Sequence, residues 1–408
     1  MDAFFVSVEE LSDPSLKGKA VVVGGKAHER GVVAAASYEA RKFGIHSAMP
    51  LRTAFKLCPQ AIFLDGHPER YREYSSGVLS VLQQFSPKVE MASIDEAYVD
   101  MSGTERLHGP PFKAAHQIHQ AMGKQTRLRC SIGIGGSRLV AKISSDLAKP
   151  NGLLWVIPAL EQNFLAPLDV RKIPGVGKVT EMRLRELGIN RIGDLASQDE
   201  SFLEEKLGKW ALSLAGKARG MDAGAWFEDE VGETGGPKSI SHEHTFAEDT
   251  SSPETLEGML ARLSEMVGRR LREQGVHAHT IQLKLRLHDF STIERSHSIE
   301  GTTQLDTEIF DYIRKLFRKH WPAGTAVRLV GVQASSLEQE ESGGQMSLME
   351  GTERGRWKVL LSTMDGLRDK HGDSTITLAN SAKAKFRERT HDNPADLHGR
   401  HRSGEDHE

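Results

Sequence analysis

The first 157 residues alternate short apolar runs with stretches of helical periodicity. The apolar runs are rich in Val, Ile and Ala and are bounded by glycine or polar residues, which is typical of short strands. They are Ala20–Val23, Gly31–Ala36, Ala61–Leu64, Cys130–Ile134 and Leu153–Ile157, with two more strands inside Val89–Met101. Helices are predicted over Arg70–Phe85, Phe112–Arg127 and Leu139–Leu147. The two strands inside Val89–Met101 are predicted to pair as a hairpin, which favours an α+β domain over a doubly wound parallel sheet.

The strand signal disappears after residue 157 and returns near residue 239. Between them lie short helical stretches punctuated by glycine, and then a Gly-rich polar stretch at Glu230–Lys238 that is the best candidate linker. The pattern that follows is strand, helix, strand, strand, helix, strand, which is the order of a ferredoxin-like unit. Its expected elements are Ser239–Thr245, Pro253–Gln274, Thr280–His288, Thr292–Glu300, Asp306–His320 and Ala326–Ser335.

Beyond Leu337 the sequence is polar. One helix is predicted over Trp357–Lys370, and the charged stretch from about Lys383 to Glu408 has the composition of a disordered tail.

Composition narrows the class of protein. The 408 residues are 38% hydrophobic and 27% charged, which suits a soluble globular protein with a sizeable core. No apolar run reaches the ~20 residues that a membrane helix needs, and acidic residues replace the basic start of a signal peptide. Cys58 and Cys130 are the two cysteines, too few for a disulfide framework or a cysteine zinc site. We therefore expect a cytoplasmic protein. The net charge of −3 excludes a uniformly basic nucleic-acid binder but leaves room for a basic groove.

The strongest local signal is the acidic pair Asp95-Glu96, inside the apolar segment Ser93–Tyr98. Adjacent carboxylates in an apolar hairpin are costly unless cations or hydrogen bonds compensate them. Neighbouring side chains on a regular strand point to opposite faces, so both carboxylates reach one site only if the backbone turns there. The pair is compatible with a divalent-metal site and equally with two solvated carboxylates at a turn.

Two further segments carry groups suited to phosphate. Tyr38 and Arg41 are three residues apart, so a helix that starts there places them on one face, where a hydroxyl and a guanidinium fork can both donate. An ordinary charged surface helix has the same pattern. Lys149 stands where a helix must end before Pro150. A lysine fixed at that point can hold a phosphate, or it can simply complement the helix dipole.

The string Ile-Pro-Gly-Val-Gly-Lys at Ile173–Lys178 precedes an apolar-periodic helix at Met182–Leu187. Gly175 and Gly177 let backbone N–H groups approach a phosphate closely. This is the pattern of a helix-hairpin-helix, which grips the DNA backbone without reading sequence. A plain turn between helices is the less favoured alternative. We expect Gly175, Gly177 and Lys178 to contact DNA phosphates.

Basic residues on the later strands are the second expected DNA contact. Lys284 and Arg286 are two apart on one predicted strand and share a face, and Arg295 lies on the next strand. The alternative is an ordinary solvated sheet face.

Gln345–Met349 is a largely apolar pentapeptide that follows Gly343-Gly344 in a polar region. Exposed apolar residues on such a segment suggest a docking peptide. In that case Gln345 supplies hydrogen bonds, and Leu348 and Met349 fill apolar pockets. The alternative is an incidental contact of the tail.

Together these motifs resemble those of the Y-family translesion DNA polymerases, in particular the bacterial polymerases IV. The resemblance runs from Met1 to about Met349, with several separate motifs in the family's order. Its markers are Asp2–Glu9, the Tyr38 and Arg41 pair, Ser93–Tyr98, Ser131–Gly135, Ala141-Lys142, Asp146–Gly152, Ile173–Gly177 and Gln345–Met349.

The resemblance implies a right-hand polymerase with a ferredoxin-like palm, small fingers, a helical thumb with the helix-hairpin-helix, and a ferredoxin-like little finger. The palm corresponds to residues 1–10 and 66–157, and its first strand is missing from the sequence. The remaining segments are 11–65 for the fingers, 158–229 for the thumb, 230–238 for the linker, 239–337 for the little finger and 338–408 for a polar tail with a clamp-binding-like peptide.

Roles carry over residue by residue. Asp95 matches the carboxylate that bridges two Mg²⁺ ions, and Glu96 the catalytic carboxylate beside it. Phe5 matches the steric gate beneath the sugar. The residues that match the triphosphate clamp are Tyr38, Arg41 and Lys149. Gln345–Met349 resembles a sliding-clamp-binding peptide, although it ends in Met349 where family examples usually end in Phe.

One departure concerns metal binding. The family has another metal-binding Asp immediately before the residue that matches Met1, and Asp2 matches the following acidic position, which is not usually a direct ligand. We expect the true start to lie upstream, with Met1 an internal methionine. The alternative is a shortened, catalytically weak protein.

The expected function is therefore template-directed DNA synthesis past damage by two-metal phosphoryl transfer, in error-prone damage tolerance. The expected partners are primer-template DNA, deoxynucleoside triphosphates and a sliding clamp, and the protein is expected to be a monomer. The alternative is a non-catalytic, clamp-tethered DNA-binding accessory protein on the same fold. A nucleotide cyclase, which can share a palm-like fold, is disfavoured by the hairpin motif and the second ferredoxin-like unit.

Overall fold

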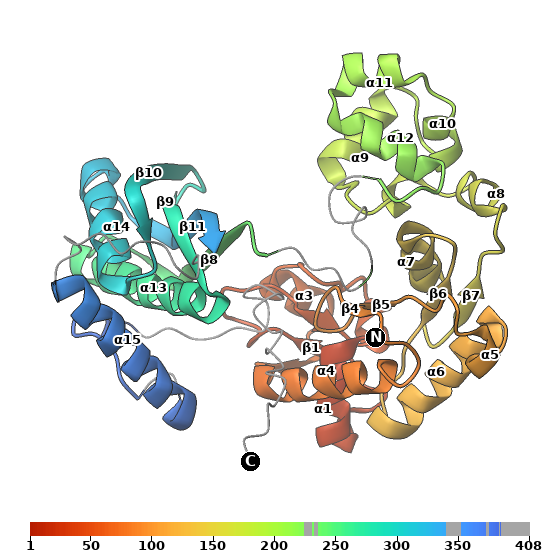
Figure 1. Ribbon diagram of the computed structural model, residues 1–408, viewed down its shortest axis with the longest axis horizontal. Coiled ribbons are helices and arrows are strands. Elements are labelled where there is room, and N and C mark those ends of the chain that lie inside the picture. Colours follow the sequence, from red (N-terminus) through yellow and green to blue (C-terminus); the bar gives the residue numbers. More distant parts are fainter. Residues whose placement is uncertain (224–230, 232–235, 340–351, 373–374, 383, 385–408) are drawn as a thin grey trace. The chain divides into compact units, whose positions relative to one another are not determined.

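The computed structural model describes residues 1–223, 231, 236–339, 352–372, 375–382 and 384 (Figure 1). The chain divides into two compact units. The first covers the described residues of Met1–Ala27 and Gly31–Thr234, and the second those of His28–Arg30 and Gly235–Asp392.

The first unit contains a three-stranded sheet of order β2-β1-β3. Strand β1 (Val21–Val23) is fully buried, pairs antiparallel with β2 (Ala35–Ala36) and pairs parallel with β3 (Ile62–Leu64). The sequence predicted a longer β2. The strand is short because the preceding residues pair elsewhere: Val33 exchanges backbone hydrogen bonds with the turn at Ala48 and Met49. The helices of this segment are α1 (Phe4–Ser12), η1 (Pro14–Leu16), α2 (Tyr38–Arg41) and α3 (Leu51–Leu57).

Two strand pairs follow. β4 (Val89–Met91) and β5 (Ala97–Val99) form the predicted antiparallel hairpin, and β6 (Ile132–Ile134) pairs parallel with β7 (Leu153–Trp155). The two pairs are separate sheets. Residues 1 and 2 connect the two pairs. The Met1 ammonium donates to the carbonyl of Asp95, before β5, at 2.6 Å, and the Asp2 N–H donates to the carbonyl of Arg129, before β6, at 3.0 Å. The helices here are α4 (Pro68–Leu82), α5 (Glu105–His108), α6 (Pro111–Thr126) and α7 (Arg138–Leu147).

Helix α7 lies directly on β6 because Gly133 has no side chain. A Cβ atom at Gly133 would come under 3.0 Å from the carbonyl oxygen of Ala141 and the amide nitrogen of Ser145, both on α7. The helix begins at Ser137, whose hydroxyl accepts from the Val140 N–H as an N-cap. This close approach fixes the middle of α7 against the sheet.

Residues 158–223 fold as helices and turns, as the sequence predicts, around an apolar core that also includes Leu139, Val140 and Ile143 of α7. The elements are α8 (Glu161–Leu165), η2 (Val170–Lys172), α9 (Lys178–Glu186), α10 (Ile192–Ala196), α11 (Glu200–Leu207) and α12 (Trp210–Ala218).

The second unit has the predicted strand and helix order. Its sheet runs β10-β9-β11-β8, so β8 and β9 are parallel with β11 between them, a split β-α-β arrangement. Helices α13 and α14 pack on one face of the sheet (Figure 1). The elements are β8 (Ser239–Thr250), α13 (Pro253–Gln274), β9 (Val276–Leu287), β10 (Thr292–Thr303), α14 (Asp306–His320) and β11 (Val327–Gln339).

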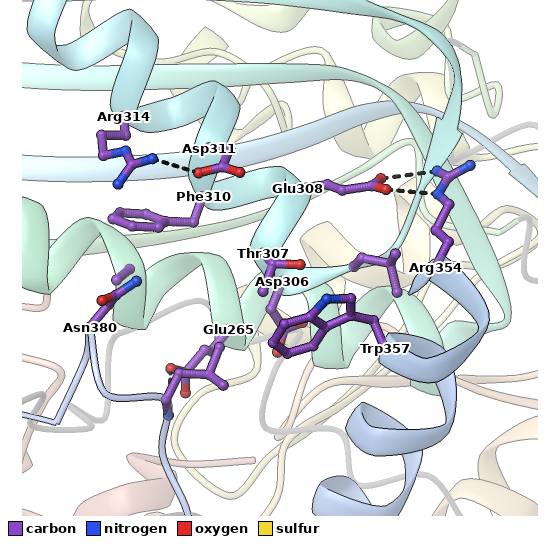
Figure 2. A pocket seen from close by; sticks show the side chains of 13 residues that line it. Glu265, Asp306, Thr307, Glu308, Phe310, Asp311, Arg314, Arg354, Trp357 and Asn380 are labelled. Carbon is purple, nitrogen blue, oxygen red and sulfur yellow. Dashed lines mark hydrogen bonds and ion pairs between the residues drawn. The ribbon is translucent and has the colours of Figure 1, made fainter. Parts of the chain in front are cut away.

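The region expected to be a polar tail contains a docked helix, α15 (Thr352–His371). Leu361 and Met364 pack on Leu305. The buried Arg368 guanidinium pairs with the buried Glu265 carboxylate of α13 at 3.0 Å. Figure 2 shows a second pair, in which Arg354 donates to both carboxylate oxygens of Glu308 at 2.7 and 2.9 Å. The described part of this segment is thus built into the second unit.

Replacing Gly133 by Ala is expected to lower the free energy of unfolding by about 1–3 kcal/mol, because the methyl group overpacks the α7 backbone. Gly123→Ala in α6 is the matched control: nothing lies within 4 Å of its added Cβ, so helix propensity should raise stability by up to about 1 kcal/mol. Urea denaturation measures both, and equal stabilities for the two variants would contradict the packing assignment.

Candidate active site

A cavity of about 670 Å³ lies in the first unit between the β4–β5 hairpin and α7. Its lining brings together Asp95, Glu96, Tyr98, Lys142 and Lys149, of which the sequence had singled out Asp95, Glu96 and Lys149. Adjacent carboxylates and lysines in one cavity are the group types that bind a phosphate and its counter-cation.

The backbone turns at the acidic pair, which is the condition the sequence set for both carboxylates to reach one site. The Ala92 and Ser93 N–H groups donate to the Glu96 carbonyl at 2.8 and 3.1 Å, closing the turn. The Ser93 hydroxyl accepts from the Asp95 and Glu96 N–H groups and donates to the Asp95 carboxylate at 2.9 Å. A single serine therefore fixes both acidic residues.

Lysines of α7 and the turn after it compensate the acidic charge. The Lys142 ammonium donates to the Glu96 carboxylate and lies 3.6 Å from Asp146. Lys149 donates to the Asp146 carboxylate at 2.7 Å. Burial tends to lower the Lys149 pKa, but the Asp146 hydrogen bond and the charges of Asp146, Glu96 and Asp95 raise it above its usual value. Lys149 therefore keeps its charge at neutral pH.

Tyr38 and Arg41 share a short helix, as predicted. The Ser37 hydroxyl caps α2 by accepting from the Ala40 N–H, and the Arg41 guanidinium lies 4.8 Å from the Tyr38 ring centroid. The Tyr38 hydroxyl is buried and has no hydrogen-bond partner among the described residues. Burial, followed by the Asp2 charge, raises the Tyr38 pKa, so the hydroxyl is a donor at neutral pH. A buried donor without a partner fits a ligand oxygen.

The carboxylates of the cavity can be compared with the ligands that a divalent cation needs. Among the described residues no three His, Cys, Asp or Glu side chains gather as a metal cage. Mg²⁺ is commonly held by one or two carboxylates together with substrate phosphates and water. Asp95 and Glu96 fit a cation that arrives with a triphosphate.

Asp2 has a structural position. Its buried carboxylate accepts from the Ser131 hydroxyl at 2.9 Å and from the Asn151 N–H at 2.7 Å. It thereby joins the first residues to β6 and to the turn before β7.

Phe5 lies on α1 and stacks on Tyr71 of α4, with ring centroids 4.4 Å apart. Tyr71 in turn donates its hydroxyl to Glu9. The sequence singled out Phe5 but neither of these partners.

The predicted helix-hairpin-helix forms at η2 and α9. Gly175 is left-handed, with φ +97°, in a turn closed by the Val176 N–H and the Ile173 carbonyl at 3.0 Å. Gly177 is the N-cap of α9, and Gly175, Gly177 and Lys178 are exposed. Behind the turn, the Lys217 ammonium donates to the Pro174 carbonyl at 3.4 Å.

The basic residues of the second unit do not form one stripe. Lys284 and Arg286 alternate with buried leucines and face away from the helices. Arg295 is paired with Leu283, so it belongs to the opposite face at the edge strand. Lys284 also bonds Glu243 at 2.9 Å and lies 3.7 Å from Glu294. Strand register, which the sequence does not reveal, decides these faces.

Two candidates lie elsewhere. The docking peptide Gln345–Met349 is outside the described residues. A second cavity, of about 690 Å³, lies between α13, α14 and α15 (Figure 2). Its lining carries four carboxylates and two guanidinium groups, an acidic excess that disfavours an anion, so the cavity beside Asp95 is the better candidate for a phosphate ligand.

The sequence motifs assign no role to Lys142, although it lies four residues before Asp146 and seven before Lys149. That spacing on one helix face was the available signal. The Glu9–Tyr71 contact joins residues 62 positions apart, and no local pattern predicts it.

Family models match most of the chain. Residues 1–146 match the impB/mucB/samB family, residues 158–189 the IMS family HHH motif, and residues 237–348 the impB/mucB/samB family C-terminal domain.

Curated relatives match nearly the whole length. The chain is 42% identical to a DNA polymerase IV of Dehalococcoides mccartyi (strain CBDB1), covering 94% of this chain and 97% of the relative. It is 35% identical to a DNA polymerase IV of Bacillus anthracis, covering 91% and 90%.

Solved structures of DNA polymerases are also similar to this chain. A Y-family DNA polymerase chimera, Dbh-Dpo4(243-245)-Dbh, matches with a TM-score of 0.71 and 28% identity over 83% of this chain and 98% of that one. The insertion ternary complex of Dbh DNA polymerase matches with a TM-score of 0.57, 27% identity and the same coverage.

No helix in the described part of the chain has the length and apolarity to span a bilayer.

The partnerless Tyr38 hydroxyl leads to a test of the site. Tyr38→Phe should leave the unfolding free energy unchanged or slightly raised, because a buried polar group without a partner is removed. It should weaken binding of a nucleoside triphosphate by about 3–10-fold, the worth of one hydrogen bond. Calorimetric titration and urea denaturation measure the two effects. Loss of stability with unchanged affinity would show that the hydroxyl is structural.

Proposed function

Since the chain belongs to the impB/mucB/samB family of Y-family DNA polymerases, we propose a residue-level account of how it adds deoxynucleotides to a primer 3′-hydroxyl on damaged templates. The observation that carries the account is the turn that presents Asp95 and Glu96 to one cavity with Lys142 and Lys149. The non-catalytic alternative has no comparable support, because the relatives matched over nearly their full length are polymerases.

Asp95 and Glu96 are proposed to hold divalent cations, two Mg²⁺ ions, together with the substrate phosphates. Such a pair of ions promotes loss of the 3′-hydroxyl proton and neutralises the pyrophosphate leaving group. Asp95 would be the carboxylate shared by both ions, and Glu96 would be the catalytic carboxylate beside it. The Ser93 hydroxyl holds the Asp95 carboxylate in position.

Tyr38, Arg41 and Lys149 are proposed to bind the triphosphate. Tyr38 donates its free hydroxyl, Arg41 its guanidinium and Lys149 a charge that Asp146 holds in place. Positioning plus charge stabilisation is most of what phosphoryl transfer requires of a protein. Phe5 is proposed to close the space beneath the sugar against a 2′-hydroxyl, a rejection by shape.

The segments take the following roles in this account: residues 1–10 and 66–157 form the palm, 11–65 the fingers, 158–229 the thumb and 239–337 the little finger. DNA contacts are proposed at the thumb hairpin, through Gly175, Gly177 and Lys178, and on the open face of the little-finger sheet, through Lys284 and Arg286. Arg295 belongs to the other face and contributes only if DNA wraps the edge strand. The protein is proposed to act as a cytoplasmic monomer.

Gln345–Met349 is proposed to bind a sliding clamp. Met346, Leu348 and Met349 supply apolar contacts, and Met349 at the end of the peptide lacks the aromatic ring that a Phe would offer there. Tethering would raise the local concentration of the enzyme at a primer end.

Asp95→Asn is expected to reduce primer extension by about two orders of magnitude or more, since it removes charge that holds the cations. DNA binding should persist. The comparison is made in the 408-residue chain and in one extended upstream by the family's metal-binding Asp. Extension at the unmutated rate in both backgrounds would refute the assignment.

Changing Lys284 and Arg286 to Ala is expected to reduce the slope of log affinity against log salt by about 0.9 for each DNA phosphate that the protein no longer neutralises. Arg295→Ala is the control on the opposite face. Glu243→Gln should tighten DNA binding, because it releases Lys284 from its carboxylate partner. Fluorescence anisotropy at several salt concentrations measures all three. If the double variant keeps both affinity and slope, this sheet face does not bind DNA.

Changing Gln345, Leu348 and Met349 to Ala should abolish stimulation by a sliding clamp and leave extension by the free enzyme intact. Met349→Phe should strengthen clamp binding. Undiminished stimulation of the triple variant would place the docking site elsewhere in the chain.

A further inference from the structure

Tyr71 is held at both ends by a single helix, α1. Phe5 and Glu9 are four residues apart on α1 and therefore share a face. Phe5 stacks on the Tyr71 ring, with centroids 4.4 Å apart and planes 29° apart. Glu9 accepts the hydrogen bond of the Tyr71 hydroxyl. The tyrosine is fully buried, so its ring has two fixed contacts with the helix that carries Phe5.

Glu9 is an unusual residue on the buried face of α1, because it carries a carboxylate there and its side chain is only 5% exposed. Buried carboxylates are retained when several donors satisfy them. Here the donors come from the start of α4: the Tyr71 hydroxyl and the His67 ring nitrogen Nδ1 at 2.9 Å. The Arg70 guanidinium lies 3.7 Å away and adds an ion pair. Glu9 thus fixes α1 to the first turns of α4.

The Tyr71 hydroxyl keeps its proton under working conditions. Burial, and then the hydrogen bond and charge of Glu9, raise the Tyr71 pKa above its usual value. The contact is therefore a hydroxyl donating to a carboxylate, which is stronger than a bond between neutral groups. It fixes the hydroxyl end of Tyr71 to the helix that carries Phe5.

We infer that Glu9 is a positioning residue for sugar selection, acting through Tyr71 on the Phe5 ring. The inference rests on the proposed role of Phe5 as the gate. Excluding one hydroxyl group by shape requires the gate ring to keep its place to within a fraction of an ångström. Closely packed side chains transmit small displacements, so a Tyr71 ring without its anchor would let Phe5 recede.

A purely structural role for Glu9 gives a different result. Removal of a buried carboxylate with two hydrogen-bond donors and an ion-pair partner would then lower stability and reduce incorporation of deoxyribonucleotides and ribonucleotides by the same factor. The ratio of the two efficiencies separates the roles, because a change common to both sugars cancels in it.

The test measures kcat/KM for dCTP and CTP opposite a template deoxyguanosine, together with equilibrium binding of each nucleotide to the protein–DNA complex. Glu9→Ala is expected to lower the dCTP:CTP ratio about tenfold, the factor equivalent to about 1.4 kcal/mol. Tyr71→Phe keeps the ring and removes the hydroxyl, so it should lower the ratio in the same direction. Glu9→Gln keeps an acceptor and should restore most of the ratio. Glu73→Ala, at an exposed position of α4, is the matched control and should change nothing.

A variant that combines Glu9→Ala with Phe5→Ala tests whether Glu9 acts through the Phe5 ring. If Glu9 acts through Phe5, the double variant should show the ratio of Phe5→Ala alone. A lowered ratio in Phe5→Ala with an unchanged ratio in Glu9→Ala and Tyr71→Phe would overturn the role of Glu9 and leave the gate in place. An unchanged ratio in Phe5→Ala itself would overturn the gate, and with it this inference.

Discussion

The contact between α7 and β6 at Gly133 is the constraint on which the rest of the site depends. Because the glycine lets the helix backbone approach the strand, the middle of α7 is fixed opposite the β4–β5 hairpin. Lys142 then reaches Glu96, and Asp146 holds Lys149 at the end of the same helix. A residue without a side chain thus determines where two ammonium groups meet two carboxylates.

The acidic side chains of the site are compensated by donors from neighbouring residues. Asp95 and Glu96 are tolerated next to an apolar hairpin because Ser93 donates to one and Lys142 to the other. The same logic recurs where function is less obvious. Glu9 is buried among the donors of α4, and Glu265 is buried against Arg368. Glu9 joins α1 to α4, and Glu265 joins α13 to α15, elements that lie far apart in the sequence.

The elements with strong local signals were predictable. Helix α13 begins and ends as expected because Ser252 caps it, Pro253 opens it and Gly275 ends it in a left-handed conformation. The acidic pair and the hairpin glycines were also visible as motifs. What local patterns could not give was partnership: the face of Arg295 follows from strand register, and the docking of α15 follows from ion pairs with distant residues.

The most direct test of the account is whether Asp95 and Glu96 together bind a divalent cation in the presence of substrate. Electron paramagnetic resonance with Mn²⁺, primer-template DNA and a non-hydrolysable deoxynucleoside triphosphate measures that binding. The account predicts protein-bound Mn²⁺ that disappears when Asp95→Asn and Glu96→Gln are combined and persists in the exposed control Glu73→Ala. Equal Mn²⁺ binding by the double variant and the unmodified protein would contradict it.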